Sequence, residues 1–350
     1  MTKVNQVDPA NIVLFISAVA TVYYLWYGIL RCYPSSWNQR MSNINYGEWN
    51  KNKVFAEIHD FYGNSSLTSE VTIVTAYFNI GSFPKGIGTY TPDLYTKWMS
   101  VFGRLDNPLI MFTDSEDVLE IFKKQRAKFP AERTKLFLIA RKSLWSFSLA
   151  SAIKSIFSQP NYPKYEPNTV NENYSCVMHS KFELMSKVIR EKLLNTRYVS
   201  WLDIGLFRAT VHETQIFQID LPKDFDHTKI GYSEVVKFDT SLTPLDIVSN
   251  DRVWVGGAMF IGTPDIMYIF TEDYMRSVTK MIEMKVMSTD QQVLYSMYLS
   301  SFPIKPRTEI QLFTSSSGSD WFYIGYITKD IHDKKKRESH DLSFYNAQYI

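Results

Sequence analysis

The pattern of apolar and polar positions divides the chain into an uncharged N-terminal run and a longer region of short alternating elements. The nineteen residues 12–30 (IVLFISAVATVYYLWYGIL) carry no charge, and a polar, turn-rich stretch follows up to about residue 70. At ~1.5 Å per residue, a helix of this length spans close to the ~30 Å hydrocarbon core of a bilayer. We therefore expect a short tail over 1–11, a transmembrane signal anchor over 12–30 and a stem over 31–70.

The same apolar run is also compatible with a buried core helix, but its surroundings favour an anchor. Aromatic residues cluster at its end, as they do at membrane interfaces. Basic residues on its two sides are too evenly matched to fix the orientation. Two glycosylation sequons, at Asn64 and Asn173, favour a luminal body. We expect a single-pass, type II glycoprotein with its body in the lumen of the Golgi or endoplasmic reticulum.

From residue 71 to about 330 the pattern predicts an α/β domain. Fully apolar strands that alternate with helices are typical of a parallel sheet covered on both faces. Strands are expected at Val71–Phe78, Pro108–Asp114, Lys135–Ala140, Tyr198–Phe207 and Arg252–Thr263, with shorter β-rich stretches (TQIFQID and EVVKF) between the last two. Helices are expected at Val54–Phe61 (weakly), Leu94–Leu105, Asp117–Lys128, Ser180–Leu194, Tyr268–Met287 and Ser288–Phe302. The segment Phe147–Glu172 contains several prolines and is expected to be a loop, and 331–350 a charged, flexible tail.

Composition narrows the function classes. The chain has 38 Lys and Arg against 36 Asp and Glu, a net charge of +2, so a dedicated nucleic-acid binder is not favoured. Its 2 cysteines cannot build a disulfide framework or a zinc cluster. The motifs of P-loop NTPases, zinc proteases and serine esterases are missing from the sequence. The 22 Tyr, 23 Phe and 8 Trp favour a packed interior and ring-lined surfaces, without naming a ligand.

Candidate chemistry follows from the ends of the predicted strands. In an open parallel sheet, ligands bind beyond the carboxyl ends of the strands. Four pairs meet this rule: Asn79 and Gly81, Thr113 and Asp114, Asp203 and Gly205, and Gly256 and Gly257. Asp203 is the sharpest candidate, because an apolar run leads to a single carboxylate followed by a glycine. It can bind Mg²⁺ or Mn²⁺, or it can simply cap a turn.

The order of these motifs resembles glycosyltransferases of the GT-A fold. Closer still, the chain from about Val71 to Tyr326 resembles the HtrL/YibB family of glycosyltransferase-like proteins, through the segments VTIVTAYFNIG, NPLIMFTD, HSKFELMSKVIR, YVSWLDIGLFR, VWVGGAMFIGT and STDQQVLY. The resemblance implies a GT-A-like, Rossmann-related mixed sheet flanked by helices. It also implies transfer of a sugar from a nucleotide-sugar donor, such as a UDP-sugar, to a glycan or other hydroxyl acceptor, with Mn²⁺ or Mg²⁺ as cofactor.

On this resemblance, Asp203 is expected to contact the metal or the ribose. Lys181, at the predicted start of a helix, is expected to meet the diphosphate, although a solvated first-turn lysine is an equal alternative. Asn79 lies on the same rim as the donor. Gly256 and Gly257 would let the sugar approach closely.

Asp290 is the expected catalytic residue, as a base for the acceptor hydroxyl or as a group that orients the donor. An alternative is structural, because Ser288 and Gln291 have capping-box spacing and an acid in a first helical turn is favoured.

Two departures limit what the resemblance implies. The second acid of the D-x-D motif is Gly205, and the late histidines are His332 and His340, both in the charged tail. A metal-independent relative, or a non-catalytic protein that binds or scaffolds glycans on the same fold, therefore stays an alternative.

Overall fold

The computed structural model describes residues 48–63 and 67–330. The anchor predicted over 12–30, the sequon at Asn64 and the tail over 331–350 lie outside these residues. No helix within the described ranges has the length and apolar character needed to cross a membrane. The sheet and every helix described after residue 67 belong to a unit that begins at Phe55.

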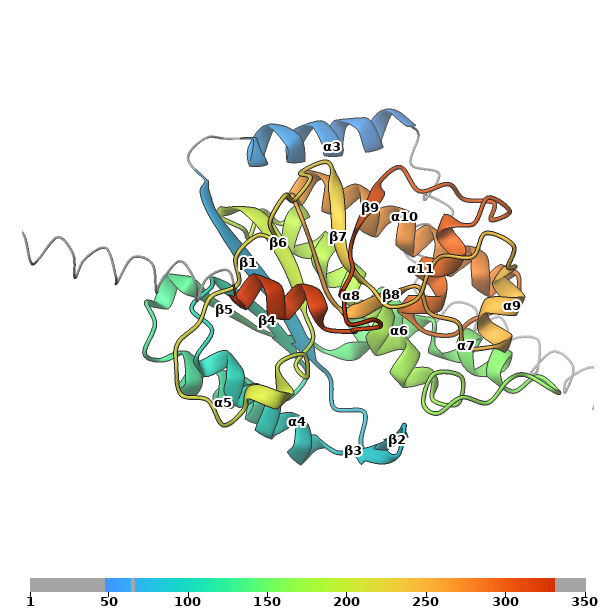
Figure 1. Cartoon of the computed structure of the whole chain (residues 1–350), viewed down its shortest axis with the longest axis horizontal. Coiled ribbons are helices and arrows are strands. Elements are labelled where there is room, and N and C mark those ends of the chain that lie inside the picture. Colours follow the sequence, from blue (N-terminus) through green and yellow to red (C-terminus); the bar gives the residue numbers. More distant parts are fainter. Residues whose placement is uncertain (1–47, 64–66, 331–350) are drawn as a thin grey trace, which may run out of the picture. The chain divides into compact units, whose positions relative to one another are not determined.

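The fold is a mixed α/β sheet of seven strands flanked by helices (Figure 1). The strand order is β5-β4-β1-β6-β8-β7-β9. Strand β8 runs antiparallel to its two neighbours, and the other pairs are parallel. The strands are β1 (Thr68–Tyr77), β4 (Leu109–Thr113), β5 (Thr134–Leu138), β6 (Thr196–Leu202), β7 (Lys229–Glu234), β8 (Val255–Gly262) and β9 (Glu309–Phe313). A separate hairpin joins β2 (Phe83–Lys85) to β3 (Gly88–Tyr90).

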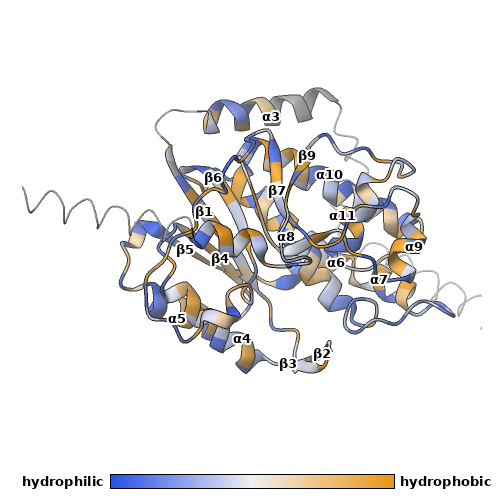
Figure 2. Ribbon diagram, in the orientation of Figure 1, coloured by the Kyte–Doolittle hydropathy of each residue, from blue (hydrophilic) through white to orange (hydrophobic). Residues whose placement is uncertain are grey.

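Apolar strands and amphipathic helices form a continuous interior. All residues of β4 are buried, as expected for a strand covered on both faces. Figure 2 shows apolar residues along the sheet and both apolar and polar patches on α4 and α5. The helices are α3 (Glu48–Tyr62), α4 (Pro92–Met99), α5 (Glu116–Arg126), α6 (Trp145–Ser148), α7 (Ala150–Phe157), α8 (Glu172–Arg190), α9 (Pro244–Ser249), α10 (Pro264–Glu283) and α11 (Asp290–Tyr298).

The segment 147–172 departs from the sequence-based expectation. It is not a loop throughout, because α7 fills its first half and buries Ile153 and Ile156. Its prolines begin only after this helix. Helix α8 also starts earlier than predicted, at Glu172, because the side chain of Asn171 accepts a hydrogen bond from the Tyr174 N–H at 3.1 Å and caps the helix.

The second half of the sheet also differs from the prediction. The stretch TQIFQID forms only an isolated bridge between Leu105 and Phe217, and β7 ends where EVVKF begins. Strand β9, which the pattern did not predict, pairs with β7 at the edge of the sheet. Its residues are mostly half-buried, so they lack the continuous apolar run of an inner strand.

The strand order creates a switch point between β1 and β6. The chain passes from β1 outward to β4 and β5 and then returns to the other side of β1 as β6. Connections leave the ends of β1 and β6 in opposite directions, which opens a crevice at the carboxyl edge. Because β8 is antiparallel, its beginning lies at this same edge, where the Asp203 N–H donates to the Ala258 carbonyl at 2.8 Å.

We predict that Gly256→Ala destabilises the fold. A Cβ at this position in β8 would lie 2.6 Å from the carbonyl oxygen of Trp321, a backbone atom that has little freedom to move. Crowding of this kind costs about 1–3 kcal/mol. Urea denaturation should show this loss, whereas Gly88→Ala, where no atom lies within 4 Å, should leave the midpoint nearly unchanged. Equal midpoints for the two variants would contradict the predicted packing.

Candidate functional site

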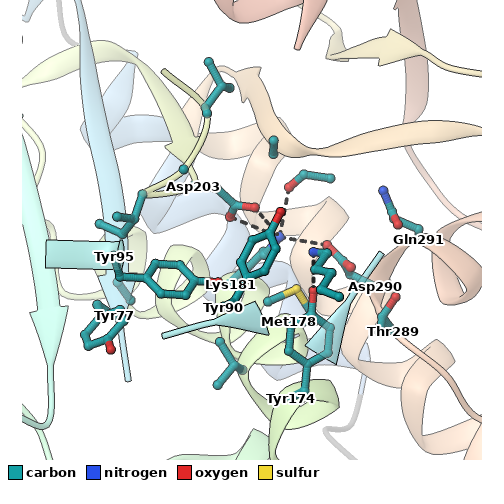
Figure 3. Close-up of a pocket in the computed structure, with 18 of the residues that line it drawn as sticks. Tyr77, Tyr90, Tyr95, Tyr174, Met178, Lys181, Asp203, Thr289, Asp290 and Gln291 are labelled. Atoms are coloured by element: carbon teal, nitrogen blue, oxygen red, sulfur yellow. Dashed lines mark hydrogen bonds and ion pairs between the residues drawn. The ribbon is translucent and has the colours of Figure 1, made fainter. Parts of the chain in front are cut away.

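A cavity of about 400 Å³ opens at the switch point. The ends of β1 and β6 and the start of β8 form its floor, and residues of the β2–β3 hairpin, α4, α8 and α11 complete its walls. Figure 3 shows Tyr77 and Tyr95 on one side of this cavity and Asp290 and Gln291 of α11 on the other. Its size lies within the usual ~300–1,000 Å³ of small-molecule sites.

A buried ion cluster lies at the cavity floor, formed by Lys181, Asp203 and Asp290 (Figure 3). The Lys181 ammonium donates to Oδ2 of Asp203 at 3.2 Å, to Oδ2 of Asp290 at 3.0 Å and to the carbonyl of Gly257 at 2.9 Å. An ammonium has three N–H groups, so these contacts use all of them. The Lys181 and Asp290 side chains are only 2% and 3% exposed, whereas that of Asp203 is 33% exposed.

The charges in this cluster depend on one another. Burial by itself lowers the pKa of Lys181, but the carboxylates of Asp203 and Asp290 outweigh burial and hold the pKa above its usual value. Burial raises the pKa of Asp290, and Lys181 opposes that rise. The lysine is therefore charged at neutral pH, and it compensates the two carboxylates. The indole of Trp201 also donates to Oδ1 of Asp203 at 2.7 Å and fixes that carboxylate.

Local sequence explains how Asp290 reaches the lysine. The capping box of α11 consists of Thr289 and Gln292, whose side chains are hydrogen-bonded at 2.8 Å. The pair predicted from spacing, Ser288 and Gln291, does not form it. Because Thr289 caps the helix, the Asp290 side chain is left to contact Lys181, and Gln291 lines the cavity.

The two glycines of β8 make room for protein groups. A Cβ at Gly257 would lie 2.6 Å from Oδ2 of Asp290, so this glycine lets α11 bring its carboxylate against Lys181. Gly256 faces the backbone of Trp321 and does not line the cavity.

Other predicted site residues have different positions. Lys181 lies within α8 and not at its N-terminus, so the free N–H groups of a helix start do not join it. Asn79 is exposed outside the cavity lining, and its side chain accepts from the Gly81 N–H at 3.0 Å. Its own N–H donates to Asp114, which forms an ion pair with Arg141 at 2.6 Å.

The described residues fit a resident divalent cation poorly. Within 48–63 and 67–330, no group of three or more His, Cys, Asp or Glu side chains could hold a metal. Gly205, at the second D-x-D position, faces the ring of Trp98, which would lie 3.1 Å from a Cβ there. The carboxylates of Asp203 and Asp290 already share the Lys181 ammonium. His332 and His340 lie outside the described residues, so the predicted Mn²⁺ or Mg²⁺ stays a prediction.

Sequence reasoning missed the aromatic wall of the cavity. Tyr95 and Trp98, one turn apart on α4, have ring centroids 5.0 Å apart, and Tyr90 lies 5.5 Å from Trp98. Tyr77, at the end of β1, lies 5.3 Å from Tyr95. The spacing of Tyr95 and Trp98 was visible, but such a pair more often belongs to a core. Here the rings line the cavity and offer flat apolar faces with polar tips.

Two further cations line the cavity wall. The Lys85 ammonium, on the hairpin, donates to the Tyr174 hydroxyl at 2.6 Å. Desolvation lowers the pKa of Lys85, although the carboxylate of Asp203 opposes this. The guanidinium of Arg208, an exposed residue after β6, lies 4.7 Å from the ring centre of Phe322. Unlike Lys181, neither cation is enclosed by carboxylates.

His179, next to the cluster on α8, is buried and neutral. Its Nδ1 lies 2.8 Å from the Tyr274 hydroxyl, and its Nε2 has no hydrogen-bond partner among the described residues. Burial, aided by the charge of Lys181, lowers its pKa from 6.5 to about 3. It faces α10 and does not line the cavity.

Comparison with known proteins identifies the family. The model of the HtrL_YibB family, described as bacterial proteins of unknown function, matches residues 69–326, and the chain belongs to this family. The match includes every residue of the cavity lining. No curated protein matches the chain.

We predict that His179 makes the fold sensitive to mild acid. The unfolded imidazole has a pKa near 6.5 and the folded one about 3, so the stability it supports is complete above pH 6.5 and falls as the pH drops toward 3. Between pH 7.5 and 5 the loss should be about 2 kcal/mol. Urea denaturation of wild type and His179→Asn at both pH values tests this. Parallel losses in the two proteins would show that His179 is not responsible.

Proposed function

We propose that this member of the HtrL_YibB family binds a nucleotide-sugar, such as a UDP-sugar, and transfers the sugar to a hydroxyl of a glycan or other acceptor. The observation that carries the proposal is the cavity at the β1/β6 switch point, with one half-exposed carboxylate on its floor and tyrosine rings on its wall. Such crevices are where doubly wound sheets bind nucleotides. The mixed sheet also supports a GT-A-like architecture, which the sequence resemblance implies.

The cavity offers a separate contact for each part of such a donor. Rings such as Tyr90, Tyr95 and Trp98 suit the flat faces of a base or a sugar. Lys85 and Arg208 are the cations with room to meet phosphate oxygens, because the N–H groups of Lys181 are all used. In this proposal Lys85 and Arg208 contact the diphosphate, in place of the Lys181 predicted from the sequence.

The two carboxylates take different roles in the proposal. Asp203 is held by Trp201 and Lys181 but remains partly exposed, so it accepts hydrogen bonds from ribose or sugar hydroxyls. Asp290 lines the cavity with a pKa raised chiefly by burial, which suits a base that takes a proton from an acceptor hydroxyl. The ammonium of Lys181 opposes this rise in the pKa of Asp290. Its hydrogen bond also holds the Asp290 carboxylate in place.

A second candidate function is glycan binding without catalysis. The crowding between Gly205 and Trp98 favours it, because this contact leaves no space for the second acid of a D-x-D motif. The aromatic wall would serve a glycan as well as a donor. The two functions differ in the role of Asp290. It is a catalytic base in a transferase, whereas in a glycan-binding protein it only maintains the structure of the cavity.

The cellular setting is also part of the proposal. An anchor over 12–30 would hold the domain at a membrane, with the body in the Golgi or endoplasmic reticulum lumen. Asn173 lies half-buried in the first turn of α8, where a glycan would have limited room. The luminal placement therefore depends on the sequon at Asn64, which lies outside the described residues.

We predict that Asp203→Asn weakens donor binding. A panel of UDP- and GDP-sugars, titrated calorimetrically into the detergent-purified full chain, should include at least one ligand. A lost hydrogen bond to a charged group costs about 1.5–3 kcal/mol, which is roughly tenfold or more in affinity. Asp117→Asn, on the exposed start of α5, is the control and should bind as wild type does. No binding across the panel would refute the donor site.

We predict that Asp290→Asn separates catalysis from binding. Loss of a general base lowers rates by about 10²–10⁴-fold, while donor affinity should change little. Release of the nucleotide product, measured with a mixture of acceptor sugars, reports the rate. If wild type binds a donor or a glycan but releases no nucleotide, and Asp290→Asn binds equally well, the non-catalytic function is the correct one.

A further inference from the structure

Three oxygen groups converge on one point at the cavity floor. Asp203 follows β6, Gly257 belongs to β8 and Asp290 begins α11, and their oxygens lie 2.9–3.2 Å from Nζ of Lys181. Two carboxylates and a backbone carbonyl are the kind of hard donors that bind Mg²⁺ or Mn²⁺. In this protein a side chain rises from α8 and delivers a positive charge to that point (Figure 3).

We propose that the Lys181 ammonium takes the place of a divalent cation between Asp203 and Asp290, so that the cavity binds its phosphorylated ligand without metal. The identity of the ligand rests on the proposed function. The replacement of the metal by lysine does not, because it concerns groups of the protein alone. Lys181 is then a positioning residue, which fixes the two carboxylates and offsets one of their two negative charges without touching the ligand.

Burial makes the lysine hard to displace. Its side chain is 2% exposed, and its helical neighbours Ser180 and Phe182 are also buried, so the backbone of α8 is held in place. A metal that entered between the carboxylates would leave a buried ammonium without counter-ions, which is strongly unfavourable. The Lys181 ammonium therefore prevents a divalent metal ion from binding between the carboxylates.

Among residues 48–63 and 67–330, no group of three or more His, Cys, Asp or Glu side chains offers a second position for the metal. Trp98 crowds the place where the side chain of an acid at 205 would begin. The phosphate charge has other partners, since Lys85 and Arg208 line the same cavity. The cluster of Lys181 with two carboxylates carries a net charge of −1, which repels phosphate less than the −2 of the carboxylates alone would.

The test compares wild type with Lys181→Met, which keeps the length of the side chain and removes its charge. Thermal unfolding of the full chain is followed with MnCl₂ or EDTA and no donor present. Wild type should show no Mn²⁺-dependent shift. Lys181→Met should show a Mn²⁺-dependent shift, because its two carboxylates are no longer paired with an ammonium. The double variant of Lys181→Met with Asp203→Asn should show no such shift. Lys187→Met, on the same helix but paired with exposed Glu191, should behave as wild type.

Donor binding supplies the functional measurement. Wild-type affinity for a bound nucleotide-sugar should agree within twofold in EDTA and in excess Mn²⁺. In Lys181→Met it should fall at least tenfold in EDTA and recover in part with Mn²⁺, a rescue that a purely structural lysine would not give.

The inference is overturned by a wild-type Mn²⁺ shift that Asp203→Asn abolishes, by donor binding that EDTA removes, or by a folded Lys181→Met protein that ignores Mn²⁺. If no donor binds, the proposed function fails, but the Mn²⁺ shifts still decide the role of Lys181. If Lys181→Met does not fold, the thermal unfolding of wild type and of Asp203→Asn is compared with and without Mn²⁺. No Mn²⁺ shift in either protein supports the inference, and a wild-type shift that Asp203→Asn abolishes overturns it.

Discussion

A buried ammonium that needs two carboxylates is the constraint on which this site depends. Lys181 is almost fully enclosed, and removing either partner would leave charge in a poorly solvated place. The two carboxylates come from segments far apart in the chain, at residues 203 and 290. The ion cluster therefore ties α8, the end of β6 and the start of α11 into one unit, and it gives the cavity floor a fixed geometry.

Several features of the second half of the sheet are consistent with that requirement. The antiparallel direction of β8 brings Gly257 to the edge where β6 ends, and the missing side chain at 257 admits Asp290. Capping by Thr289 leaves Asp290 free to face inward. Each of these features has a local cause in the sequence. Their common effect, the contact of Asp290 with Lys181, arises only when α8, β8 and α11 pack together.

The sequence predicted the parts of the fold that depend on local pattern. Four of the inner strands, β1, β4, β6 and β8, have largely apolar runs and were predicted, and the family resemblance was correct. The inner strand β7 has a more polar sequence and was not predicted with its observed bounds. Prolines after residue 157 concealed α7, and the half-buried edge strand β9 gave no signal. Lys181, Asp203 and Asp290 were each chosen as candidates, but their mutual contact spans up to 109 positions and no periodicity reports it. The contact between Trp98 and Gly205, which crowds out a second acid, was equally invisible.

The two sides of the cavity come from different parts of the chain. Tyr90, Tyr95 and Trp98 all lie in the single connection between β1 and β4, whereas the ion cluster draws on α8, β6, β8 and α11. Substitutions in this one connection can reshape the cavity without disturbing the buried charges. The shape of one side of the cavity therefore depends on a single stretch of chain, whereas the charges on the other side depend on several elements that must come together.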